Sequence, residues 1–227
     1  MLRDDKPTYN LPKLSDLSVK SNYEVSLILG FIDQNISAFP PFFLNNRDSD
    51  RENRISDFLV YYFNLCLRNE PYRDFPSFSF GKNPTQASSG QETDIGVVVL
   101  TKSVKPITII EFEAKRLSDS SNNKEYVCGS RGGIERFKRG EHASHLTICG
   151  MFGYVQKRSL EEWIQKVNIW IDELSMTNMD SNTNWSNSNE KLRPIASFEY
   201  VEKLESLHSR IGSLNPLIVY HYFIKLY

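Results

Sequence analysis

The fold of this chain is decided by Asp94-Ile-Gly-Val-Val-Val-Leu100 and by Ile107-Thr-Ile-Ile-Glu-Phe-Glu-Ala-Lys115. Both runs are apolar and rich in β-branched residues, and the polar, turn-forming residues 101–106 separate them. Short apolar runs bounded by turn residues predict buried strands. We therefore expect a β-hairpin whose first strand opens with an acid and whose second strand ends in Glu-x-Lys.

Side chains on a strand alternate between its two faces, so Glu111, Glu113 and Lys115 are expected to share one surface. Asp94 opens the neighbouring strand and is expected near them. Charges on a buried face are costly unless they have partners or hold a metal ion. The alternative is that these residues only cap the ends of two strands in an unrelated α/β domain. The cost of burying them together favours a functional site.

Such a set of residues suits the hydrolysis of phosphodiester bonds. Carboxylates hold the divalent metal ion that polarises a phosphoryl oxygen and supplies hydroxide near neutral pH. Asp94 and Glu113 are the candidate ligands of one Mg²⁺ ion, with the Ala114 carbonyl as a further oxygen ligand. Lys115 can orient the attacking water or stabilise the charge that develops on the phosphorane.

The arrangement resembles the PD-(D/E)XK nuclease superfamily over roughly residues 50–158. The first acid of that pattern matches Asp94, although Thr93 stands where the name-giving proline would be. The acid-x-lysine matches Glu113-Ala114-Lys115, and the glutamate that many members carry on the preceding helix matches Glu52 best. The resemblance implies an α/β, restriction-endonuclease-like fold with a mixed central sheet flanked by helices. It also implies a Mg²⁺-dependent nuclease in which Mn²⁺ can substitute.

Glu52 also has a purely structural interpretation. Ser49-x-x-Glu52 matches a capping box, in which the glutamate reaches back to the backbone N–H of the serine. Apolar side chains follow at helical spacing: Ile55, Phe58, Leu59, Tyr62 and Cys66. Glu52 is therefore either a capping residue or an auxiliary ligand of the metal or the water, and the sequence leaves both open.

Residues 129–140 combine glycines with basic side chains. Glycines let a backbone approach closely, and basic side chains neutralise phosphates, so this segment predicts a nucleic-acid contact beside the site. A solvated basic face is the alternative. The four candidate contacts are Arg131, Arg136, Lys138 and Arg139.

A structural zinc site is a further option for the segment that follows. Its ligands would be His142, His145 and Cys149, together with Cys128. Their spacing fits no strong zinc pattern, and Cys149 falls within an apparent strand. Ordinary surface or core histidines are the more common case.

The chain as a whole is expected to form one nuclease-like domain over residues 1–227, with its core at about 50–175. Helices are expected from Tyr23 to Ile36 and after Ser159, where Ser159-x-x-Glu162 is a second capping box.

The C-terminal part predicts a loop and two strands. Residues 176–190 are rich in Asn, Ser, Thr and Asp, which indicates a flexible loop with Trp185 exposed. The runs 197–208 and 217–226 alternate over part of their length. We expect them to add edge strands to the sheet.

Composition limits the class of protein. The 227 residues carry a formal net charge of −1, so nucleic-acid binding cannot be argued from overall charge. The three cysteines are widely spaced, which suits free thiols in a reducing cytosol. We expect no apolar run of membrane-spanning length. We therefore expect a cytoplasmic protein that does not bind a membrane.

Two functions fit these observations. The first is hydrolysis of DNA in restriction or antiviral defence. The chain could then be the effector subunit of a larger complex that a regulatory ATPase or sensor protein controls. A homodimer would suit the cutting of both strands. The second is a non-catalytic subunit that keeps a nuclease-like fold for binding or assembly. The chain has little room for a recognition domain, which favours the second. The joint presence of Asp94, Glu113 and Lys115 favours the first.

Overall fold

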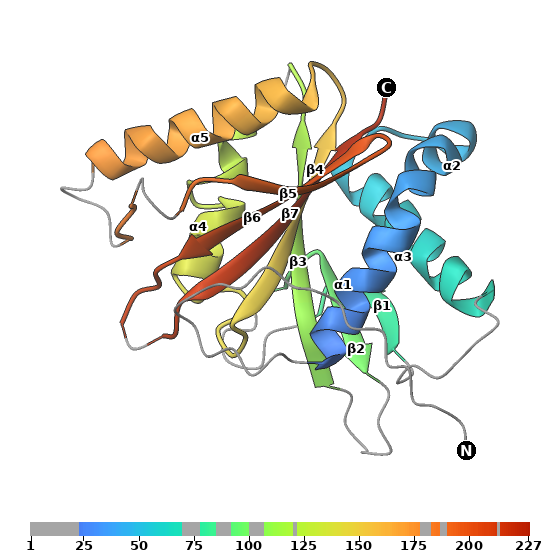
Figure 1. Ribbon diagram of the computed structural model, residues 1–227, viewed down its shortest axis with the longest axis horizontal. Coiled ribbons are helices and arrows are strands. Elements are labelled where there is room, and N and C mark those ends of the chain that lie inside the picture. Colours follow the sequence, from blue (N-terminus) through green and yellow to red (C-terminus); the bar gives the residue numbers. More distant parts are fainter. Residues whose placement is uncertain are drawn as a thin grey trace.

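The protein is a mixed α/β structure with helices on both sides of a seven-stranded mixed sheet (Figure 1). The structure is a computed structural model and describes residues 23–69, 78–84, 92–99, 107–119, 122–177, 183–186, 190–212 and 214–227. The strand order is β1-β2-β3-β4-β7-β6-β5. The expected mixed sheet flanked by helices is therefore confirmed.

Along the chain, four helical elements precede β1, β2 and β3; η2 and α4 precede β4; and α5 precedes β5, β6 and β7. The helical elements are α1 (Tyr23–Asn35), η1 (Ile36–Ala38), α2 (Phe39–Asn46), α3 (Glu52–Asn69), η2 (Asn123–Tyr126), α4 (Gly133–Lys138) and α5 (Leu160–Met176). The strands are β1 (Phe78–Lys82), β2 (Ile95–Val99), β3 (Ile107–Leu117), β4 (Ile148–Val155), β5 (Arg193–Phe198), β6 (Val201–His208) and β7 (Leu217–Lys225).

The predicted hairpin is present. Strands β2 and β3 are antiparallel, with Ile95 opposite Phe112 and Gly96 opposite Glu111. The expected turn at 101–106 lies outside the described residues. Strand β4 then runs parallel to β3, and β7 runs parallel to β4. The hairpin therefore joins a parallel centre, which places the end of β3 well inside the sheet.

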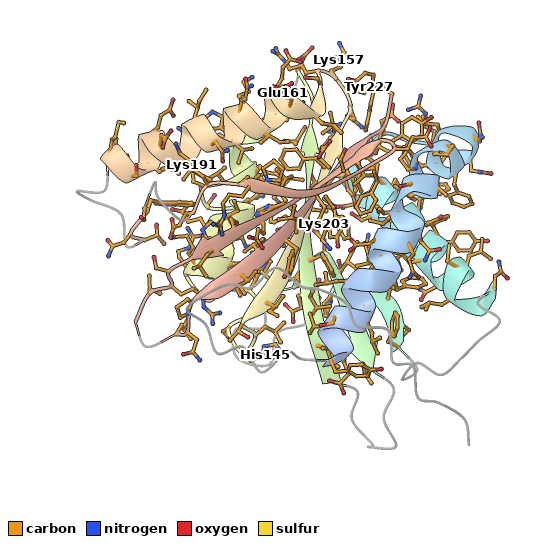
Figure 2. The ribbon with its side chains drawn as sticks, in the orientation of Figure 1. His145, Lys157, Glu161, Lys191, Lys203 and Tyr227 are labelled. Carbon is orange, nitrogen blue, oxygen red and sulfur yellow. The ribbon has the colours of Figure 1, made fainter. Side chains whose placement is uncertain are left out.

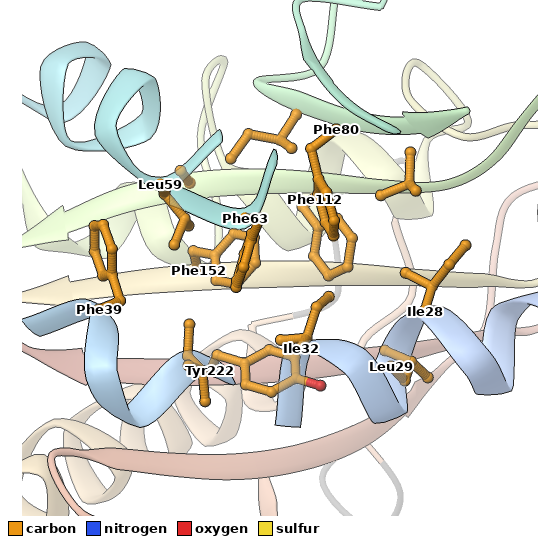
Figure 3. Packing of buried hydrophobic residues seen from close by; sticks show 14 of the residues in the cluster. Ile28, Leu29, Ile32, Phe39, Leu59, Phe63, Phe80, Phe112, Phe152 and Tyr222 are labelled. Atoms are coloured by element: carbon orange, nitrogen blue, oxygen red, sulfur yellow. The ribbon is translucent and has the colours of Figure 1, made fainter. Parts of the chain in front are cut away.

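The two faces of the sheet are covered by different helices and carry different cores. Helices α1, α2 and α3 cover one face, where aromatic and aliphatic side chains such as Phe63, Phe112 and Phe152 pack together (Figure 3). Helices α4 and α5 cover the other face, with Trp163 and Phe223 in a second cluster (Figure 1). Glu111, Glu113 and Lys115 alternate with residues of the first core, so they point toward the side of α4 and α5.

The C-terminal strands occupy a more central place than predicted. β7 lies between β4 and β6, and all its residues from Leu217 to Ile224 are buried. The prediction that both C-terminal runs add edge strands is therefore wrong, because β7 is apolar on both faces and must be covered on both. The run 197–208 is divided between β5 and β6, with a turn at Tyr200, which has a positive φ of 67°. Of the three C-terminal strands, only β5 is at an edge of the sheet.

Trp185 is also placed differently. Its side chain is only 3% exposed and belongs to the second core, so the prediction of an exposed tryptophan is wrong. The ring of His208 meets it edge-on, with ring centroids 6.0 Å apart. Thr183 and Glu190 are buried beside it, while residues 178–182 and 187–189 lie outside the described part. The ring of Trp185 and the buried side chains of Thr183 and Glu190 therefore place the described part of this polar segment in the core.

The N-terminal helices correct one expectation. Residues Tyr23–Asn46, which form α1, η1 and α2, are long and apolar enough to cross a membrane by length and composition. This length departs from the expectation that no apolar run approaches membrane-spanning length. A core helix of a folded domain passes the same test, and Ile28 and Ile32 of α1 are fully buried in the first core (Figure 3).

Candidate active site

Asp94 and Glu113 meet across the hairpin. Because Ile95 is opposite Phe112, the residues before and after that pair, Asp94 and Glu113, are next to each other on the ladder. The Asp94 carboxylate accepts a 2.7 Å hydrogen bond at Oδ2 from the Ala114 N–H. The acid that opens β2 is thus fixed against the Glu-x-Lys segment of β3, as the sequence predicts.

Glu113 is the most heavily bonded residue of the site. Its side chain is only 2% exposed. At Oε1 it receives Lys115 Nζ at 3.1 Å and Arg136 Nη1 at 3.1 Å. At Oε2 it lies 3.0 Å from His142 Nδ1. Three side chains from three places in the chain therefore hold one buried carboxylate.

Glu52 reaches the same site from the first residue of α3. Its Oε2 accepts a 2.6 Å hydrogen bond from the Arg116 N–H, and its Oε1 lies 4.0 Å from Lys115 Nζ. Ser49 Oγ accepts a 3.2 Å hydrogen bond from the N–H of Arg51, the residue before α3, and not from Glu52 as a capping box requires. Of the two interpretations that the sequence leaves open, the geometry favours the site, because the carboxylate of Glu52 is directed to β3.

The electrostatics of the site separate the two acids. Burial and the neighbouring charge of Glu113 raise the pKa of Asp94 to about 7. Burial alone would raise the pKa of Glu113, but the His142 hydrogen bond and the charge of Lys115 outweigh it, so that pKa lies below its usual range. Asp94 therefore lacks sufficient positive charge around it, whereas Glu113 is well neutralised.

Lys115 is held in its charged form. Burial alone would lower the pKa of Lys115, but the carboxylates of Glu113, Asp94 and Glu52 outweigh it and raise that pKa. A protonated lysine has three N–H donors and no lone pair to accept a proton. Lys115 is thus suited to stabilise negative charge or orient a water molecule, and unsuited to act as a base.

A divalent cation at this site would need oxygen ligands from Asp94 and Glu113. Among the described residues, no group of three or more His, Cys, Asp or Glu side chains could hold a metal ion. Mg²⁺, however, is commonly bound by one or two carboxylates together with water and substrate oxygens. Asp94 and Glu113 provide two such carboxylates, and the raised pKa of Asp94 reflects a charge that a cation would compensate. The residues present therefore fit a two-carboxylate Mg²⁺ site, and the Ala114 carbonyl stays a predicted further ligand.

A pocket of about 280 Å³ opens at Lys115 and Glu52. This volume is close to the lower end, roughly 300 Å³, of typical small-molecule sites, so the pocket suits one small polar group. Its wall carries three cations and two carboxylates. Its lining residues are Arg51, Glu52, Lys115, Arg116, Asn122, Glu125 and Tyr126.

The basic segment is used mostly inside the protein. Lys138 is 1% exposed and pairs with the buried carboxylate of Glu190, so its predicted contact with nucleic acid needs correction. A lysine without water around it cannot meet a phosphate. Arg136 binds Glu113, and Arg139 pairs with both Glu135 and Glu141. Arg131 is exposed at the surface, where the prediction needs it.

The zinc option finds no support in the geometry. His142 contacts Glu113, and Cys149 is buried in β4 with a thiol whose pKa burial raises well above its usual value. His145 is exposed and lies at the opposite end of β4 from Lys157 (Figure 2). Cys66, Cys128 and Cys149 are all free thiols, as expected.

Sequence reasoning missed the role of Arg136 and His142. The sequence predicts a phosphate contact for Arg136 and offers zinc binding as an option for His142, and it assigns neither residue to Glu113. The short helix α4 has no long apolar period that would show which face meets the sheet. The signal that could have identified them is the buried acid itself, since a carboxylate on a covered face requires donors from the element that covers it.

A scan of protein-family models finds none that matches this chain, and comparisons with curated proteins and with solved structures find no match either.

Proposed function

We propose that this protein is a Mg²⁺-dependent nuclease of the PD-(D/E)XK type, with a restriction-endonuclease-like arrangement of its sheet, and that it hydrolyses phosphodiester bonds of DNA. The observation that carries the proposal is the convergence of Asp94, Glu113 and Lys115 at adjacent positions of the β2–β3 hairpin. A buried acid, a second acid that is partly buried and a charged lysine that lines a pocket form an arrangement that structural packing alone does not require.

Each residue has a defined task in this proposal. Asp94 and Glu113 would hold the cation, which when bound polarises the phosphoryl oxygen and supplies hydroxide. Lys115 stays protonated and stabilises the negative charge that builds up on the phosphorane. Glu52 balances the charge of Lys115 and keeps the end of β3 in place through Arg116.

The substrate would approach through the pocket. Lys115 and Arg116 line it from β3, and Arg51 lines it from the start of α3. These cations replace Lys138 as candidate phosphate contacts, because Lys138 is buried. Arg131 is exposed and remains a candidate for contact with a strand that extends beyond the pocket.

The proposal is tested by cleavage. Purified protein is incubated with plasmid, linear duplex and single-stranded DNA, with Mg²⁺, with Mn²⁺ and with EDTA. We expect cleavage with either metal and none with EDTA. Lys115→Ala should lose at least about 100-fold in rate, as expected for removal of a charge that acts on the transition state. Lys191→Ala is a matched control, because Lys191 lies on the surface in a pair with Asp172. Cleavage that persists in Lys115→Ala would overturn the assigned roles.

A second candidate function is a non-catalytic subunit that uses the same fold for binding or assembly. The observation in its favour is that both oxygens of Glu113 are already bonded by Lys115, Arg136 and His142. An ionic cluster can persist as structure when its members satisfy one another. Absence of cleavage under every condition above, with a folded protein, favours this candidate.

The biological setting we propose is restriction or defence against foreign DNA in the cytoplasm. The partners would be DNA and a regulatory ATPase or sensor protein that controls the enzyme as part of a larger complex. Cutting both strands would suit a homodimer. Light scattering with and without a short duplex tests the homodimer.

A further inference from the structure

The imidazole of His142 makes a single polar contact among the residues that the structure describes. His142 follows α4 and is completely buried. Its Nδ1 lies 3.0 Å from Glu113 Oε2, and its Nε2 has no hydrogen-bond partner in the described part of the chain. Burying the Nε2 atom without a hydrogen-bond partner is costly. The contact between Nδ1 and Glu113 is the polar interaction of the ring that can offset this cost.

The two oxygens of Glu113 have different kinds of partners. Oε1 faces two cations, Lys115 and Arg136, which would compete with a divalent ion for the same oxygen. Oε2 faces an imidazole, which can donate from Nδ1 while it carries no net charge. His142 can therefore orient the carboxylate without repelling a metal ion, whereas Lys115 and Arg136 cannot.

The position of His142 is itself held by buried contacts. The Phe137 ring meets the imidazole edge-on, with ring centroids 6.1 Å apart. Helix α4 is anchored by the buried Lys138–Glu190 pair and by the hydrogen bond of 2.9 Å from the Thr183 hydroxyl to Glu135. The imidazole is thus part of a rigid wall beside the site, as a positioning residue should be.

We propose that His142 is a positioning residue that holds Oε2 of Glu113 and thereby fixes the orientation of the carboxylate that would bind a divalent cation. The inference rests on the proposed function only in taking Glu113 as a metal ligand. Hydrogen-bond partners of metal-binding residues orient the ligand, and their loss typically lowers metal affinity about 10- to 100-fold. His142 acts through Glu113 and is not assigned any contact with substrate.

The test compares two substitutions of His142 that differ in one N–H group. His142→Asn keeps an N–H donor near the place of Nδ1, and His142→Leu removes it while filling a similar volume. The full chain is titrated with Mn²⁺ alone, and free Mn²⁺ is measured by electron paramagnetic resonance. Glu113→Gln shows which binding belongs to this site. His145→Leu, at an exposed position, is the matched control.

We expect the wild-type protein and His145→Leu to bind Mn²⁺ alike, His142→Leu to bind it at least about 10-fold more weakly, and His142→Asn to recover most of the affinity. Urea unfolding of each variant shows that the protein is folded. Equal affinity of His142→Leu and the wild type would overturn the proposal. Equal loss in His142→Asn and His142→Leu would also overturn it, because a merely structural role would not distinguish the donor.

The outcome separates this inference from the proposed function. If the wild type binds Mn²⁺ through Glu113 and His142→Leu weakens that binding, the positioning role stands even when no DNA is cut. If DNA is cut and His142→Leu cuts and binds Mn²⁺ like the wild type, the nuclease stands and the positioning role is wrong. A wild type that neither binds Mn²⁺ nor cuts DNA overturns both.

Discussion

The Glu52 carboxylate accepts a 2.6 Å hydrogen bond from the backbone N–H of Arg116, across 64 residues of sequence. This contact joins the first residue of α3 to the end of β3, where the Glu-x-Lys segment lies. An acid that could have capped its own helix instead holds the strand of the candidate site. Its charge and its hydrogen bond can be separated by substitution.

Glu52→Gln keeps an oxygen acceptor for the Arg116 N–H but removes the charge near Lys115. Glu52→Ala removes both. We expect both variants to lose at least about 10-fold in DNA cleavage, because the charge acts in the site. Only Glu52→Ala should lose stability, by about 1 kcal/mol in urea unfolding, since it alone leaves the N–H without its acceptor. If Glu52→Gln cuts like the wild type, the role of Glu52 is confined to the strand end.

Asp94→Asn should make the metal-free protein more stable at pH 8. The pKa of Asp94 is raised to about 7 by burial and by Glu113, so the folded state keeps a proton that the unfolded state loses near pH 3.8. Stability is thus lost as pH rises from about 4 to 7, and a neutral side chain avoids the loss. We expect a gain of about 1–3 kcal/mol in EDTA at pH 8, together with loss of cleavage. A destabilised Asp94→Asn at pH 8 would contradict this balance of charge.

The buried pair Lys138–Glu190 should be essential for stability. Burial alone would raise the pKa of Glu190, but His208 and Lys138 outweigh it and lower that pKa to about 2. Lys138→Met leaves this carboxylate buried without its cation, which costs about 3–5 kcal/mol. Lys191→Met, in a surface pair with Asp172, should change stability by less than about 0.5 kcal/mol. Urea unfolding of both variants at pH 7 measures the difference.

Two buried histidines predict a loss of stability on acidification. The hydroxyl of Ser206 bonds to the Nε2 atoms of His208 and His221, each at 2.7 Å, and His221 Nδ1 bonds to the Tyr126 hydroxyl at 2.9 Å. Burial lowers the pKa of His208, and it lowers the pKa of His221 well below the ordinary value of 6.5. The unfolded chain therefore binds protons first as pH falls below about 6.5.

The contribution of these two histidines to the free energy of unfolding should thus be highest above pH 6.5 and decrease below it, by up to about 1.4 kcal/mol per pH unit for each histidine, and it opposes the contribution of Asp94 between about pH 4 and 7. Urea unfolding from pH 8 to pH 5 measures the slope. His208→Gln should make the slope shallower, whereas His145→Gln, at an exposed site, removes a histidine without removing a buried imidazole. A slope that both variants leave unchanged would show that other groups cause the acid sensitivity.

Gly150 should not tolerate even one methyl group. A Cβ at this position of β4 would overlap the ring of Phe112, which stacks on Phe152 with ring centroids 4.8 Å apart. We expect Gly150→Ala to cost about 1–3 kcal/mol through overpacking. Gly81→Ala is the matched control, because a Cβ on Gly81 of β1 meets nothing within 4 Å. Comparable stability of the two variants would contradict the tight contact between β3 and β4.

The hairpin and its acids could be predicted from local pattern, and the donors around them could not. Period-two alternation places Glu113 and Lys115 on one face whatever surrounds them. That Arg136 and His142 meet Glu113 depends on how α4 packs on the sheet, and a helix of six residues has too little pattern to show this. The sequence predicts surface positions for Lys138 and Trp185 because their neighbours along the chain are polar. Both side chains are nevertheless buried in the folded protein.

The sequence by itself determined the β2–β3 hairpin, the pairing of Asp94 with the Glu113-Ala114-Lys115 segment and the helix that carries Glu52, since each depends on residues close together along the chain. Only the tertiary structure decided that β7 enters the middle of the sheet, that Glu52 bonds to β3 and that His142 holds Glu113. These contacts join distant segments, and their geometry follows from which faces must be buried together rather than from any local preference.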